Sequence, residues 1–183
     1  MTDPLIRQLP LPGFVARGLD VRDESVLAAP VAAPKAGTRI VLWSGSLGDD
    51  DGPAPRNWTA AACETLDAAT ARWVDAGLAG ELLVRPHARH IVSDIPSAVR
   101  FARRWGQTGP HLLWDPAAML EGPMVAPAHA CTHLERLIDA LEHPDLARAI
   151  EAVALLDGRG PWDSELIAAA KDRCAALGVR VLD

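Results

Sequence analysis

Side chains that can transfer protons or bind anions follow two short apolar runs, at residues 81–84 and 111–114. The residues of these types just beyond the two runs are Arg85, His87, Arg89, His90 and Asp115. Imidazole exchanges a proton near neutral pH, guanidinium binds phosphate or carboxylate, and a carboxylate can act as a general base. If the two runs are neighbouring strands, these side chains are candidates for a single site.

A helix is expected between the two runs, because Ser93–Asp94 suits an N-cap, Pro96 suits a first turn and Gly106 suits the exit. A strand, a helix and a second strand form a βαβ unit, which requires a parallel sheet covered by helices. In such sheets the residues that follow the strands gather at one edge, where ligands bind.

The same alternation continues along the chain. Strands are expected near residues 39, 81, 111, 151 and 179, with a doubtful edge strand at 26–33. Intervals of roughly 30 to 40 residues are typical of βα repeats. Five or six strands are too few for a closed eight-stranded barrel of about 250 residues. We expect an α/β fold with a shortened or incomplete (β/α) TIM-barrel-like parallel sheet, and an open doubly wound sheet remains the alternative.

Two regions differ in composition. Residues 1–37 are rich in proline and alanine and form a predicted N-terminal arm, and residues 38–183 form the predicted barrel-like domain. Within the domain, Asn57 is a plausible cap for a helix that runs to about Gly77. The residues expected on the buried face of that helix are Trp58, Ala62, Leu66, Ala69 and Trp73.

Composition excludes several classes of protein. The 183 residues carry a net charge of −6, which argues against nucleic-acid binding through bulk positive charge. No apolar run approaches the roughly 18 residues that span a bilayer, and the N-terminus lacks a signal-peptide pattern. We therefore expect a cytoplasmic protein with no nucleic-acid or membrane partner. The three cysteines show no metal-binding spacing and are expected to be buried, reduced thiols.

The segment from Arg39 to about Gly160 resembles the xylose isomerase-like TIM-barrel superfamily, which includes sugar-phosphate isomerases and epimerases and AP endonucleases. The stretches that carry the likeness are Arg85-Pro86-His87, Val92–Pro96, Trp114–Ala118 and Ala152–Gly158. They match the family's motifs in order and spacing more than in residue identity, over about two-thirds of the chain. The resemblance implies proton transfer next to a carbonyl in a sugar or hydroxy-carbonyl compound, with His87 or Asp115 as the base. Arg85 would stabilise the developing enolate in place of a metal.

The chain departs from the family at its metal ligands. Arg85 replaces the triplet glutamate, and alanines replace the histidines at Ala118, Ala152 and Ala154. An arginine beside the site would repel a hard cation, so no metal and no other cofactor is expected, although His87, Asp115 and Asp157 could hold a transition metal weakly. The same departures support the alternative of a non-catalytic relative that serves as a binding or assembly subunit.

Four further residues are candidates for substrate binding. They are Arg89, Trp114, Asp157 and Arg159. The arginines suit a phosphate or carboxylate, the aspartate suits sugar hydroxyls, and Trp114 with Trp43 could form a stacking wall. The alternatives are surface salt bridges for the arginines, loop caps for the aspartates and core packing for the tryptophans. A shortened barrel also leaves sheet edges that a second subunit or another protein is expected to cover.

Overall fold

The computed structural model describes residues 14–20, 39–47, 54–155 and 160–182. The doubtful edge strand at 26–33 and the candidate residues Asp157 and Arg159 lie outside this described part of the chain. The N-terminal region nevertheless contributes a strand, at residues 14–20.

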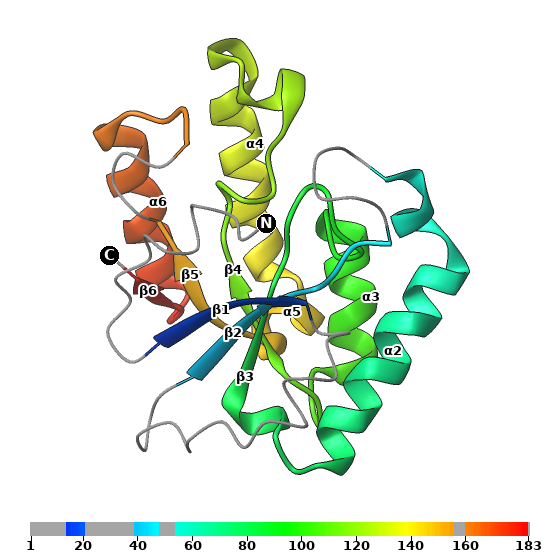
Figure 1. Cartoon of the computed structure of the whole chain (residues 1–183). Coiled ribbons are helices and arrows are strands. Elements are labelled where there is room, and N and C mark those ends of the chain that lie inside the picture. Colours follow the sequence, from blue (N-terminus) through cyan, green and yellow to red (C-terminus); the bar gives the residue numbers. More distant parts are fainter. Residues whose placement is uncertain (1–13, 21–38, 48–53, 156–159, 183) are drawn as a thin grey trace.

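Six parallel strands form one sheet whose spatial order follows the chain (Figure 1). They are β1 (Phe14–Asp20), β2 (Arg39–Trp43), β3 (Leu82–Arg85), β4 (His111–Trp114), β5 (Ile150–Ala154) and β6 (Arg180–Leu182). Because the order never reverses, crossovers of one hand place the connecting helices on one face of the sheet. This arrangement confirms the expected shortened α/β fold and excludes the doubly wound alternative, in which the order reverses.

Within the described residues, five helices and several short 3-10 turns connect the strands. The helices are α2 (Ala60–Asp75), α3 (Ile95–Trp105), α4 (Pro127–Asp139), α5 (Pro144–Ala149) and α6 (Ser164–Ala176). The 3-10 turns are η2 (Pro55–Trp58), η3 (Ala79–Glu81), η4 (Gly122–Val125) and η5 (Ala140–Glu142). In the described ranges, none of these helices combines the length and the apolar character needed to cross a bilayer.

The start of α3 agrees with the sequence. The Asp94 carboxylate accepts the backbone N–H of Ser97, whose hydroxyl in turn accepts the N–H of Asp94. This reciprocal capping box satisfies two N–H groups that the first helical turn would otherwise leave without partners. The exit is at Gly106, where an added Cβ would lie 2.5 Å from the Ala102 carbonyl oxygen.

The start of α2 differs from the prediction. Thr59, and not Asn57, is the N-cap, since its hydroxyl accepts the N–H of Ala62. Trp58 precedes the helix in η2 and is 57% exposed, although it was expected on the buried face. The other expected face residues of α2 are buried. The 3-10 turn shifts Trp58 off the α-helical repeat, and its indole N–H instead donates to the Ser93 hydroxyl at 3.1 Å.

Both faces of the sheet are buried, as expected for parallel strands. The strand residues that join the main core with the helices include Ile40, Leu42, Leu82, Val84, Leu112, Trp114 and Val153. A second cluster is formed by the alternate residues Val41, Leu83, Leu113, Ala152, Ala154 and Leu182. Because side chains alternate along a strand, the last residue of each strand points to one face of the sheet or to the other. The last residues that share a face can therefore form a site.

Candidate functional site at the carboxyl end of the sheet

Trp43, Arg85 and Asp115 lie together on the face of the sheet opposite the helices. Trp43 and Arg85 are paired in register across β2 and β3, and each follows the face of Val41 and Leu83. Asp115 comes directly after β4 and continues the parity of Leu113. The structure therefore brings together Arg85 and Asp115, which the sequence predicted to share one edge.

Arg85 and Asp115 form a buried ion pair. Arg85 Nη2 lies 2.5 Å from Asp115 Oδ2, and the two side chains are 2% and 1% exposed. Asp115 Oδ1 accepts the backbone N–H of Ala118 at 3.2 Å, and the Arg85 guanidinium lies 4.2 Å from the centroid of the Trp43 ring. A buried charge is tolerated when it is paired and hydrogen-bonded in this way. Because both side chains are buried, a ligand in solution does not reach the Arg85 guanidinium or the Asp115 carboxylate.

Two histidines complete an aromatic cluster with Trp43. The His87 and His90 rings meet Trp43 edge-on, with centroids 4.9 and 5.2 Å from the Trp43 ring. The two imidazoles lie 4.8 Å apart, and both are partly exposed. Solvent therefore reaches the two imidazoles of this aromatic cluster.

The hydrogen bonding of His87 limits what its ring can do. Its Nδ1 accepts the backbone N–H of Arg89 at 3.2 Å. A neutral imidazole that accepts at Nδ1 carries its proton at Nε2. In this tautomer Nε2 carries the proton and is a hydrogen-bond donor. The base role that the sequence predicted for His87 stays a prediction.

The loops that carry the cluster are tied together by buried polar groups. Ser44, which follows β2, accepts the N–H of Val92 at 3.0 Å through its hydroxyl. Asn57 donates to the Ser46 hydroxyl and to the Arg89 carbonyl, and its own side-chain oxygen accepts the N–H of Leu47. These contacts join the segment after β2 to the segment after β3. The sequence suggested only a helix cap at Asn57, because nothing in its spacing indicates a partner 32 residues away.

The side chains of Arg89 and Trp114 have partners outside the cluster. Arg89 forms an ion pair with Glu121 at 2.6 Å and is partly exposed. Trp114 faces the helices in the main core, fully buried, and donates its indole N–H to the Leu137 carbonyl at 3.0 Å. Strand parity explains the difference, because Trp114 lies one residue before Asp115 and so on the other face. Trp43 lies on the other face, beside Arg85, but is itself only 7% exposed, so the stacking role expected of the two tryptophans stays a prediction for Trp43 alone.

In the part of the chain that the structure describes, no three histidine, cysteine, aspartate or glutamate side chains are grouped as metal ligands. His87 and Asp115 belong to the site, while Asp157, the third residue of the weak metal set considered from the sequence, falls outside the described residues.

Comparisons with known proteins add no family assignment. No family model, no curated protein and no solved structure matches this chain. The likeness to the xylose isomerase-like superfamily therefore stays a prediction from the sequence, and the function must be argued from the site itself.

Proposed function

We propose that this protein binds a small hydroxylated or carbonyl compound of the sugar class at the aromatic cluster of Trp43, His87 and His90, without turning it over. It would be a relative of the sugar isomerases that has lost the metal centre and kept the binding edge. The observation that carries the proposal is the buried Arg85–Asp115 pair. Two of the three residues with a predicted catalytic role are used to hold the sheet end together.

The exposed surface of the cluster suits this ligand class. The Trp43 ring is 7% exposed and forms the buried base of the cluster, so the accessible surface is that of the two imidazoles packed against it. The two imidazoles, whose ring centroids lie 4.8 Å apart, would supply the polar contacts to a carbonyl or hydroxyl oxygen. A few placed polar groups beside an aromatic wall are typical of small-molecule sites.

The test is a calorimetric titration of the purified protein with a panel of aldoses, ketoses and their phosphates, with each mixture then checked for conversion by NMR. We expect binding of at least one compound and no conversion. His87→Ala and His90→Ala should each weaken binding by about tenfold, the effect of losing one hydrogen bond. His133→Ala is the matched control, because His133 is also partly exposed but lies on α4. An unaffected affinity in both cluster variants, or no binding across the panel, would refute the proposal.

A second candidate function is proton transfer next to a carbonyl, as in an isomerase or epimerase. The observation that favours it is the pair of partly exposed imidazoles, since one can accept a proton while the other donates to the carbonyl oxygen. In this case His90 is the base and His87 polarises the carbonyl. The Arg85 guanidinium packs against the Trp43 ring and positions it.

Solvent exchange separates the two candidates. An enzyme of this type would incorporate deuterium next to the carbonyl of a bound ketose or aldose in D2O, and His90→Ala would abolish the exchange. A binding protein would leave the compound unlabelled while still binding it. Exchange that persists in His90→Ala would exclude the assigned base.

We also propose that the protein works as an oligomer or with a protein partner. In the described pairing, β1 and β6 are the outer strands of the sheet, and each pairs with a single neighbour. Outer strands of a sheet carry backbone groups that natural proteins cover or pair. Light scattering of the full chain across a concentration series should show a mass above 19.5 kDa. A monomer at all concentrations would contradict self-association.

A further inference from the structure

A second polar site lies at the opposite end of the sheet, where the chain enters β4 and β5. It is a hollow of about 250 Å³ between the end of α3 and the short helix α5. The polar residues that line it are Arg103, Arg104, Gln107, Thr108, Asp145 and Arg148. We call this region the arginine hollow. None of these residues takes part in the aromatic cluster or in the proposed function.

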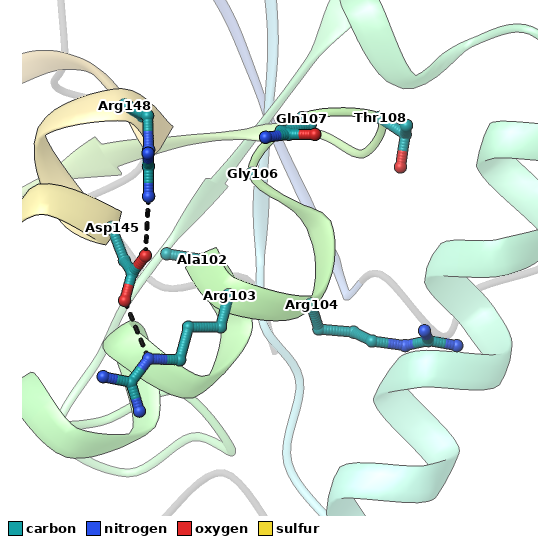
Figure 2. Close-up of a pocket in the computed structure, with 8 residues that line it drawn as sticks. All are labelled: Ala102, Arg103, Arg104, Gly106, Gln107, Thr108, Asp145 and Arg148. Carbon is teal, nitrogen blue, oxygen red and sulfur yellow. Dashed lines mark hydrogen bonds and ion pairs between the residues drawn. The ribbon is translucent and has the colours of Figure 1, made fainter.

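Two arginines share one carboxylate in the arginine hollow (Figure 2). Arg103 Nε lies 2.7 Å from Asp145 Oδ2, and Arg148 Nη2 lies 2.8 Å from Asp145 Oδ1. The two guanidinium groups approach Asp145 from different helices, α3 and α5. Arg104 is directed away toward α2 and lies over the Trp105 ring at 4.9 Å.

The close approach of α3 to α5 brings the two arginines together. Gly106, at the end of α3, allows it, because a Cβ at this position would lie 3.4 Å from the Ala149 Cβ as well as against the Ala102 carbonyl. Gln107 and Thr108 follow in the turn and supply an amide and a hydroxyl at the rim (Figure 2). The hollow therefore depends on the packing of the end of α3 against α5.

The arginine hollow is positive on an acidic chain. Arg103 and Arg148 face one aspartate there and Arg104 also lines the hollow, whereas the whole chain carries a net charge of −6. A guanidinium has five N–H donors in a planar fork. Arg103 and Arg148 each direct one of these to Asp145, and their side chains are 65% and 62% exposed. Donors on both groups remain accessible to a ligand.

We propose that the arginine hollow binds inorganic phosphate or a small soluble phosphomonoester. Arg103 and Arg148 would hold the phosphoryl oxygens through paired N–H groups, with Gln107 or Thr108 as a further donor. A phosphate dianion suits the site better than a carboxylate, which carries a single negative charge. Asp145 already supplies one such charge, and the hollow is still positive with it in place. The volume of the hollow accommodates a phosphoryl group and a few further atoms and is below the range of drug-sized pockets.

Asp145 has two effects in this proposal. It holds the two guanidinium groups close together in the absence of a ligand, and it competes with the ligand for them. Its carboxylate also repels an incoming anion. Replacing it with a neutral residue of the same shape should therefore strengthen binding, whereas replacing either arginine should weaken it. A purely structural ion network predicts no such opposite signs.

The experiment is a calorimetric titration of the full chain with inorganic phosphate at low ionic strength. Arg103→Gln and Arg148→Gln should each weaken binding by about tenfold, and Asp145→Asn should tighten it several-fold. Arg173→Gln is the matched control, because Arg173 is also an exposed arginine that pairs with two carboxylates, Asp139 and Glu142, but on α6. It should leave the phosphate affinity unchanged.

The outcomes are decisive in either direction. No phosphate binding by any variant, an equal loss in Arg173→Gln, or weaker binding in Asp145→Asn would overturn the proposal. Glycerol phosphate should bind like inorganic phosphate, while binding only to vesicles that contain phosphatidic acid would point to a lipid surface and against a soluble ligand. His87→Ala should retain phosphate binding, so that this test is independent of the aromatic cluster.

Discussion

The two ends of the sheet use the same arginine–aspartate chemistry in opposite environments. At the carboxyl end, one arginine and one aspartate form a pair that is 2% and 1% exposed. At the amino end, two arginines that are 65% and 62% exposed share Asp145. Water screens and competes for the second set but not for the first. Burial, and not residue type, therefore separates a structural ion pair from a site that can exchange its partner for a ligand.

The difference also separates the strand-end pair from the groups that solvent reaches. Arg85 and Asp115 have the residue types and the strand-end positions of catalytic residues. Once buried against each other, their charges mainly satisfy one another. The histidines beside them and the arginines at the far end remain in contact with solvent, where a ligand can reach them.

The largest expected effect is the loss of the buried pair. Asp115→Ala leaves the Arg85 charge uncompensated in the interior and removes the acceptor for the Ala118 N–H. The free energy of unfolding should fall by about 3–5 kcal/mol. Urea denaturation measures it, and a loss below about 1 kcal/mol would show that water reaches the pair.

The double variant Arg85→Met/Asp115→Leu sharpens the same point. Replacing both charges with apolar side chains leaves no buried charge without a partner, so most of the lost stability should return. A double variant as unstable as Asp115→Ala alone would mean that packing around Trp43, and not charge pairing, determines stability at this end.

Cys174 tests burial outside an ion pair, at an intermediate magnitude. Burial in α6 raises the pKa of this thiol to about 11. A thiol whose pKa is raised on folding stabilises the protein below its ordinary pKa of 9.0, and this stability is lost as the pH rises toward 11. The wild-type protein should lose roughly 2 kcal/mol of unfolding free energy over this range. Cys174→Ala should lose less, and equal pH dependence in both proteins would contradict the assignment.

The smallest effect is expected at the exposed network. Hydrogen bonding to Arg103 lowers the pKa of Asp145, followed by the contact with Arg148. This contribution is present above the ordinary pKa of 3.8 and is lost as the pH falls through the lowered folded value. At pH 7, Asp145→Asn should not measurably change the unfolding free energy, whereas its acid unfolding should depend less on pH. A stability loss as large as that of Asp115→Ala would remove the contrast between the two ends.

Local patterns determined much of the fold in advance. The alternation of apolar runs with helical repeats predicted the parallel sheet, and Asp94 and Gly106 marked the limits of α3. The prediction was wrong at Trp58, because a 3-10 turn and a cap at Thr59 replaced the continuous helix. A shift of one or two residues at a helix start does not change the apolar periodicity further along, so the periodicity could not reveal it.

The candidate site was only partly predictable. Strand ends placed Arg85 and Asp115 at one edge, because that depends on parallel strands alone. Trp114 is outside the site because strand parity turns its side chain to the face that the helices cover. Asn57 joins two loops of the site because its side chain donates to the Arg89 carbonyl, 32 residues further along the chain. The arginine hollow had no signal in the sequence, since Arg103 and Arg148 meet only when α3 packs against α5.

The sequence by itself determined the order of the strands from β2 to β6 and the residue types at their ends, because periodicity and capping act over a few neighbouring residues. The tertiary structure alone decided which of those charges meet each other and which meet water. That decision depends on desolvation, and the accessibility of a charge exists only after distant segments have packed around it.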